Sequence, residues 1–259
     1  MPHIGLALGA GGARGFAHIG VLEILEEHGI MPAYLSGSSM GSLIASLYAC
    51  GFTPQMMEKL AINLKRKHWL DLCVPGMGFV TGEKLRHIVK LLTRSKNIED
   101  LERPLSIVAT DLASGERVVF TEGPIHEAVR ASVSIPGIFV PYKLGSRLLV
   151  DGGVVDRVPI ELVRTMGSEL TIGVDVSLAP SNSPVRTFFD VIFQTIDVME
   201  REIFLHRTVH ADVMIRPDVG RFSSTSFTNI DIIIEEGRKA ARLMVPHIQE
   251  KMEDWRRRA

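Results

Sequence analysis

Ser39 lies between two glycines in the run Gly37-Ser38-Ser39-Met40-Gly41. In a G-x-S-x-G run the small residues leave room for a sharp turn between a strand and a helix, which lifts the serine hydroxyl out of the sheet. The positive end of the following helix and the N–H group of Met40 would then favour an oxyanion. The run predicts a serine nucleophile for acyl transfer. The alternative is a glycine-rich helix start that Ser39 only caps.

A second glycine-rich run, at positions 9–15, follows a short apolar segment and precedes a helical pattern. Such a loop can hold the pyrophosphate of a dinucleotide, but here the third glycine of the G-x-G-x-x-G spacing is replaced by Arg14, and a Walker-type G-K-[ST] is absent. We expect instead that the N–H groups of Gly11 and Gly12 form an oxyanion hole beside Ser39. Three roles stay open for Arg14: steadying the loop, meeting an anionic head group, or surface solvation.

An acyl-transfer serine needs a general base, and in many hydrolases this base is a histidine. The histidines after Ser39 are His68, His87, His126, His206, His210 and His247. His68 falls in an irregular segment, and the others fall in or beside predicted helices. None follows a strand directly, which is where a triad histidine is expected.

Asp151 is the better candidate for the base. It follows the apolar segment 147–150 directly and precedes Gly152 and Gly153, which clear space beside it. An ordinary aspartate, with a pKa near about 3.9, is a weak base. Burial raises that pKa, and a hydrogen bond to Ser39 would aim the carboxylate. A simple Asp-Gly turn is the alternative. The rival carboxylates are Asp111, Asp156 and Asp175.

These side chains must be positioned by strands that end close together. Apolar runs predict strands at 4–8, 31–36, 105–110, 118–121, 148–150, 170–176 and 213–215. Helical spacing predicts helices around 19–28, around 43–48, from 53, and at 83–92, 124–131, 187–209 and 231–252. The segment 65–82 shows no clear period and predicts a long mobile loop. The alternation predicts an α/β fold whose mostly parallel sheet is covered on both faces.

Composition excludes several classes of protein. Charged residues are 23% of 259 and the formal net charge is -1, so the basic stripe of a nucleic-acid-binding protein is absent. The two cysteines, Cys50 and Cys73, cannot build a disulfide framework, and no Cys/His cluster indicates a metal. The sequence has no secretory signal pattern and no apolar run of about 18 residues. We expect a cytoplasmic protein, with peripheral contact at the inner membrane face left open.

Taken together, the motifs resemble the patatin-like phospholipase family, and among its members the short bacterial single-domain proteins. The stretches that carry the resemblance are the glycine run 10–15 with His18 and 20–22, the serine run 37–41, the Asp-Gly-Gly run 151–153, and the stretches 109–112 and 131–137. They span roughly residues 4–160. One departure is Ala10, where the family usually has a glycine.

The resemblance implies a three-layer α/β sandwich with a central, mostly parallel sheet. It also implies a Ser39–Asp151 dyad, an oxyanion hole at Gly11 and Gly12, and hydrolysis of lipid acyl esters without metal or cofactor. The alternatives are a general carboxylesterase or thioesterase, and a catalytically idle regulatory protein of the same fold. We expect residues 1–259 to form one domain, with the helices at about 187–252 as part of it. The oligomeric state stays open.

The substrate implied is a lipid or another acyl ester, with transient membrane-surface contact left open and nucleic acid excluded. Two segments could line or gate an acyl channel. One is the loop with Trp69, Leu70 and Phe79, for which a lid role stays open. The other is the predicted helix with Phe188, Phe189, Ile192, Phe193, Ile196, Met199, Ile203 and Phe204, a stripe that is more typical of a core than of a membrane face.

Overall fold

The computed structural model describes residues 1–258 apart from 75, 178–184, 186 and 207–209. The strands are β1 (Ile4–Leu8), β2 (Pro32–Ser38), β3 (Leu105–Asp111), β4 (Arg117–Phe120), β5 (Tyr142–Leu144), β6 (Arg147–Asp151), β7 (Leu170–Val174) and β8 (Val213–Ile215). The α-helices are α1 (Ala17–Glu27), α2 (Met40–Ala49), α3 (Pro54–Asn63), α4 (Arg66–Trp69), α5 (Glu83–Leu92), α6 (Ile125–Ser132), α7 (Ile160–Thr165), α8 (Phe188–Leu205) and α9 (Ile230–Arg258). Short 3₁₀ helices are η1 (Gly12–Phe16), η2 (Ile98–Asp100) and η3 (Gly152–Val154).

The strands form one mixed sheet in the order β5-β6-β3-β2-β1-β7-β8, with β4 paired to β3 outside this path. The central pairs, β3/β2, β2/β1, β1/β7 and β7/β8, are parallel, whereas β4, β6 and β5 add antiparallel pairs. Every residue of β1, β3 and β7 is buried, as expected for strands covered on both faces. The predicted fold class, an α/β sandwich around a mostly parallel sheet, is confirmed.

The register around β3 makes β2 and β6 share one of its edges. Ile107 and Val108 pair with both β2 and β4, so β2 and β4 lie on opposite edges of β3. Ala109 and Thr110 pair with both β4 and β6, so β6 also lies opposite β4. The strands β2 and β6 therefore occupy the same edge end to end. Because β2 is parallel and β6 antiparallel to β3, their carboxyl ends meet.

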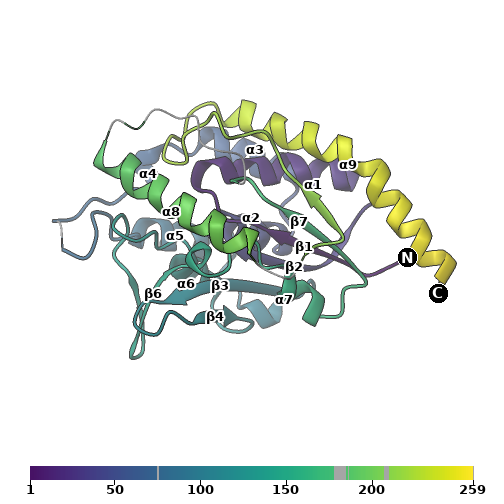
Figure 1. Ribbon diagram of the computed structural model, residues 1–259. Coiled ribbons are helices and arrows are strands. Elements are labelled where there is room, and N and C mark those ends of the chain that lie inside the picture. Colours follow the sequence, from purple (N-terminus) through teal and green to yellow (C-terminus); the bar gives the residue numbers. More distant parts are fainter. Residues whose placement is uncertain (75, 178–184, 186, 207–209, 259) are drawn as a thin grey trace.

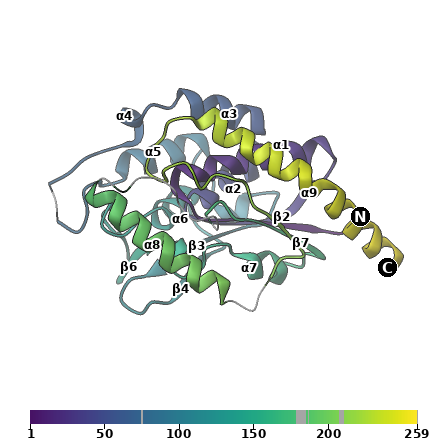
Figure 2. The same ribbon diagram turned by 45° about the horizontal axis from the view of Figure 1, so that its top comes forward.

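Helices cover both faces of the sheet (Figure 1). On one face α1, α3 and α9 lie together, and on the other lie α7 and α8; the turned view keeps this separation (Figure 2). Buried residues of α9, among them Ile233, Val245 and Ile248, belong to the same apolar core as Leu6 and Ile172 of the central strands. The chain's last helix is thus packed on the sheet that carries the predicted motifs.

Local differences from the expectations lie mainly in the less periodic segments, and the six-residue helix α7 was not predicted either. Within 65–82 the structure contains the short helix α4 and a bridge between Leu72 and Val80. The strand β5 was not predicted, because its three residues are half-buried or exposed and show no alternation. The end of the predicted helix 187–209, at 207–209, lies outside the described residues. Among the described helices, none is long and apolar enough to cross a membrane.

Candidate active site

Ser39 occupies the sharp turn between β2 and α2. Its backbone has φ 53° and ψ -125°, a strained conformation for a residue other than glycine. A side chain at Gly41 would overlap the carbonyl of Leu8 at the end of β1, so the turn fits only because this position has no Cβ. The turn places Ser39 at the first N–H groups of α2, in the arrangement that the G-x-S-x-G run predicts.

The Ser39 hydroxyl donates a hydrogen bond of 2.6 Å to Oδ2 of Asp151. The other carboxylate oxygen, Oδ1, accepts the N–H of Gly153 at 2.8 Å, so both oxygens of Asp151 are held. Ser39 is 4% exposed and Asp151 is 3% exposed. The structure therefore brings these two predicted residues together, because β2 and β6 end against each other on one edge of β3.

The end of α6 and the segment that follows it fix the backbone of both residues. The Oγ of Ser132 accepts the N–H of Ser39 at 2.9 Å. The carbonyl of Ser134 accepts the N–H of Asp151 at 2.9 Å. These contacts give a structural role to part of the stretch 131–137, for which the sequence alone suggested none.

Burial raises the pKa of Asp151 to about 7, while the hydrogen bonds from Ser39 and Gly153 act in the opposite direction. A second carboxyl group, that of Glu200 on α8, lies close by. A Cβ placed on Gly153 would lie 2.8 Å from Glu200 Oε1. Burial, and next the charge of Asp151, raise the pKa of Glu200 to about 8. Burial thus gives Asp151 far more basicity than an ordinary aspartate has, and its charge in turn disfavours ionisation of Glu200.

The glycine-rich run lies beside the serine. Gly12, with φ 55°, and Ser39 line the same cavity. Within the described part of the chain, the N–H groups of Gly11 and Gly12 donate to no acceptor. His18 Nε2 lies 2.8 Å from the Gly9 carbonyl at the start of the loop. Because burial lowers the pKa of His18 to about 4, the ring is neutral at pH 7 and donates this bond from Nε2.

Arg14 steadies this loop from inside the protein. Its side chain is buried, and it donates to the carbonyl of Phe222 at 2.8 Å and to Asp197 of α8 at 3.0 Å. Arg157 lies 3.6 Å from the other oxygen of Asp197 and 3.4 Å from Asp175. The surface and head-group alternatives for Arg14 do not fit its burial, and these contacts tie α8 to the glycine loop.

The rival carboxylates lie elsewhere. Asp111 accepts the N–H of Ala113, Asp156 pairs with Arg117, and Asp175 accepts the N–H of Ser177. Within the described residues, no histidine after Ser39 forms a hydrogen bond with the serine hydroxyl. The ring atoms of His87, His206 and His247 contact groups of their own helices, and His126 is buried in α6. No group of three or more His, Cys, Asp or Glu that could hold a metal occurs in the described part of the chain.

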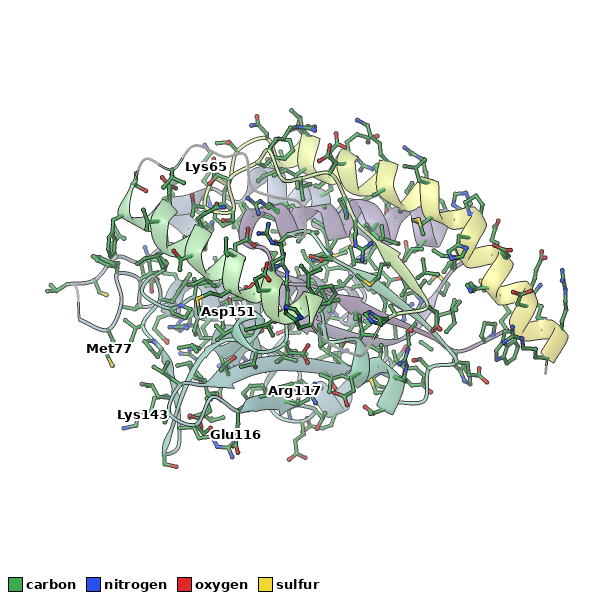
Figure 3. All side chains as sticks on the ribbon, in the orientation of Figure 1. Lys65, Met77, Glu116, Arg117, Lys143 and Asp151 are labelled. Atoms are coloured by element: carbon green, nitrogen blue, oxygen red, sulfur yellow. The ribbon has the colours of Figure 1, made fainter. Side chains whose placement is uncertain are left out.

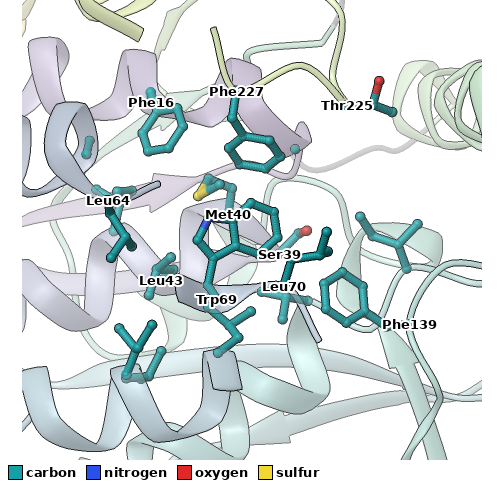
Figure 4. Close-up of a pocket in the computed structure, with 18 of the residues that line it drawn as sticks. Phe16, Ser39, Met40, Leu43, Leu64, Trp69, Leu70, Phe139, Thr225 and Phe227 are labelled. Carbon is teal, nitrogen blue, oxygen red and sulfur yellow. The ribbon is translucent and has the colours of Figure 1, made fainter. Parts of the chain in front are cut away.

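An apolar cavity of about 320 Å³ adjoins Ser39. This volume is in the range of small-molecule binding pockets. Figure 4 shows the Ser39 hydroxyl among Met40, Trp69, Leu70 and Phe139. Apart from the indole N–H of Trp69, the polar side chains among the described lining residues are those of Ser39, Ser224 and Thr225. Both segments named as channel candidates contribute, the loop through Leu72 and Phe79 and α8 through Phe193.

Three residues of this site were not found from the sequence. Ser132 contacts the backbone of Ser39 through its hydroxyl, and Ser134 contacts that of Asp151 through its carbonyl. Glu200 approaches Asp151 from helix α8, some fifty positions after Asp151 in the chain. A glutamate on the inward side of an apolar helix pattern was the one available signal for Glu200, because a charged residue is seldom buried without a partner.

Comparison with known proteins identifies the family of the chain. A family model described as patatin-like phospholipase matches residues 6–164. An uncharacterized NTE family protein of Mycobacterium tuberculosis is 36% identical over 183 residues, covering 68% of this chain and 49% of that protein. Human patatin-like phospholipase domain-containing protein 6 is 35% identical over 181 residues, covering 67% of this chain and 13% of that protein. The chain thus spans half or less of these relatives.

Solved structures show the same fold at low sequence identity. VipD from Legionella pneumophila superposes with a TM-score of 0.69 at 16% identity, covering 95% of this chain and 67% of that one. The type III effector protein ExoU gives 0.53 at 15% identity, covering 96% and 53%. With the family model spanning the glycine run, the serine turn and the aspartate, this chain belongs to the patatin-like phospholipase family.

Proposed function

We propose that this protein hydrolyses carboxylic esters of lipids, with Ser39 as nucleophile and Asp151 as general base. The observation that carries the proposal is the 2.6 Å hydrogen bond from Ser39 Oγ to a buried carboxylate at the wall of an apolar cavity. The cavity suits an acyl chain, and membership of the patatin-like phospholipase family supports a lipid ester as the substrate class.

In the proposed reaction, Asp151 takes the hydroxyl proton as Ser39 Oγ attacks the ester carbonyl carbon. The resulting oxyanion accepts hydrogen bonds from the N–H groups of Gly11 and Gly12, which have no acceptor within the described residues. Collapse of the tetrahedral intermediate expels the alcohol, which receives the proton from Asp151, and leaves an acyl-serine. A water molecule, deprotonated by the same carboxylate, then attacks the acyl carbon. The bond to Ser39 Oγ breaks, the fatty acid leaves, and Asp151 returns the proton to Ser39 Oγ.

Labelling with a fluorophosphonate tests the nucleophile. Wild-type protein should react once, at Ser39, and Ser39→Ala should not react. Ser38→Ala is the matched control: the neighbouring hydroxyl is buried without a hydrogen-bond partner among the described residues, so its loss should leave labelling unchanged. If folded wild-type protein is not labelled at Ser39, the regulatory alternative replaces the hydrolase.

The substrate class is tested with p-nitrophenyl esters of increasing chain length. Each added methylene that enters the cavity contributes about 0.8 kcal/mol, so kcat/KM should rise about fourfold per carbon until the cavity is full. A profile that falls from acetate onwards would contradict an acyl-binding cavity. An acyl thioester of matched length measured beside the oxygen ester decides between esterase and thioesterase.

A further inference from the structure

Helix α8 exposes several large apolar residues and turns two of its acids inward. Among its residues with described side chains, Glu200 alone is buried, and Asp197 faces Arg14 and Arg157. The exposed large apolar residues of this helix are Phe188, Val191, Val198, Met199, Ile203 and Leu205. On an ordinary surface helix the apolar stripe faces the core. The expectation that this stripe lies mainly in the core holds only in part. Phe188, Met199 and Ile203 are exposed, whereas the other members with described side chains are half-buried: Ile192, Phe193, Ile196 and Phe204.

A second apolar element lies at the tip of the loop between α4 and α5. Leu72, Val74 and Met77 are exposed, Val74 by 89%. The base of the loop is fixed, since Cys73 N–H donates to the Phe79 carbonyl at 2.9 Å. The tip therefore projects, and Figures 1 and 2 both place this loop and the first turn of α8 at the same end of the molecule.

The loop base is also fixed by polar contacts. The carboxylate of Asp71 accepts the N–H groups of Gly82, Glu83 and Lys84 at the start of α5. Arg130 donates to the carbonyls of Thr81 and Val140. With its base bonded in this way, the loop holds its apolar tip away from the core.

The two elements are continuous with the cavity. Leu72 is 75% exposed and also lines the cavity, so the cavity reaches the surface at the loop. Phe193 of α8 lines the cavity from the other side and packs with Val80 and Phe139. A path from the exposed surface to Ser39 therefore runs along apolar side chains.

Exposed cations accompany this apolar surface. Lys65, Lys67 and Lys143 are exposed, and none forms an ion pair with another described residue. In the view of Figure 3, Lys65 lies above Met77 and Lys143 below it, in the half of the molecule that carries the loop tip. Exposed lysines in the same half of the molecule as an apolar protrusion match the chemistry of an anionic lipid surface, with phosphate groups around an acyl layer.

We propose that the exposed loop residues Leu72, Val74 and Met77 and the exposed apolar residues of α8 form a docking surface for an anionic lipid bilayer. On docking, the apolar side chains enter the acyl layer, the lysines meet the head groups, and the cavity mouth opens into the acyl layer. An acyl chain then reaches Ser39 without crossing water. That an acyl chain moves from the bilayer to Ser39 rests on the proposed function, whereas docking itself can be measured without hydrolysis.

Docking is tested with Ser39→Ala protein and sedimentable vesicles of phosphatidylcholine with phosphatidylglycerol, or of phosphatidylcholine alone. The parent protein should sediment with the anionic vesicles and less with the neutral ones. The double variant Val74→Asp and Met77→Asp should weaken this binding about tenfold or more, because two apolar side chains that enter the acyl layer on docking are replaced by charges. Leu72 is left intact because it lines the cavity. Leu243→Asp, at an equally exposed position of α9 (79%), should bind as the parent does.

Hydrolysis separates the two proposals. With Ser39 restored, the loop variant should hydrolyse a soluble short-chain ester at the wild-type rate but lose about tenfold or more on vesicular lipid. If the wild-type protein does not hydrolyse the soluble ester either, the proposed function is refuted, and the docking proposal is unaffected. The docking proposal is overturned if the Ser39→Ala parent does not bind vesicles, or if the loop and control variants bind them equally well. It is also overturned if sedimentation velocity shows that the loop substitutions only dissociate a dimer.

Discussion

Activity should fall about tenfold when the pH is lowered from 8 to 6. Burial raises the pKa of Asp151 to about 7. The proposed base acts as a carboxylate, so activity is retained above this pKa and lost as the pH falls through it. The carboxylate fraction is about 90% at pH 8 and about 10% at pH 6. An aspartate with an ordinary pKa would remain almost fully ionised over the same interval, and activity would be flat.

The measurement is kcat/KM for a soluble ester, which reports ionisation in the free enzyme. The rate of fluorophosphonate labelling at each pH should follow the same curve, because it depends on the same proton transfer. Circular dichroism at each pH establishes that the protein stays folded. Asp151→Asn should lose activity by about a hundredfold or more at every pH, whereas Asp111→Asn keeps an oxygen for the Ala113 N–H and should retain the wild-type profile.

A flat profile between pH 5.5 and 8 would refute the reasoning at its physical step. It would mean that burial does not raise the pKa of Asp151, or that another group takes the proton from Ser39. Near-full activity of Asp151→Asn would remove the dyad altogether.

Three further substitutions probe the surroundings of the dyad. Gly41→Ala should slow labelling of Ser39 at least about tenfold, because the new methyl overlaps the Leu8 carbonyl and displaces the turn; an unchanged rate would contradict the packing. Ser132→Ala leaves the buried Ser39 N–H without its acceptor and should cost about 1–3 kcal/mol in urea unfolding; a loss near zero would show that the N–H is otherwise satisfied. The raised pKa of Glu200 means that ionising it lowers stability as the pH rises towards about 8, so Glu200→Gln should gain stability relative to wild type between pH 5 and 8.5; a pH-independent difference in thermal unfolding would contradict this.

Much of the architecture could be predicted because its signals are local. The apolar runs at β1, β3 and β7 belong to strands buried on both faces, and helix starts such as Thr53-Pro54 carry their own cap, seen here as the Thr53 hydroxyl accepting the Met56 N–H. Segments whose form depends on distant contacts could not be predicted. The loop base around Asp71 is fixed by bonds to the start of α5, and α8 is held to the glycine loop because Asp197 pairs with Arg14 and Arg157.

For the site, the sequence by itself determined the chemistry of each part. A serine between glycines, paired N–H donors in a glycine run and an aspartate at a strand end are all local patterns, since turns and strand ends depend on neighbouring residues. Only the tertiary structure decided that Ser39 and Asp151 meet. Hydrogen bonding along one edge of β3 joins β2 and β6 end to end across 112 positions of sequence, and no local pattern encodes that register. The burial that raises the pKa of Asp151 likewise arises only when both strands and α8 close over it.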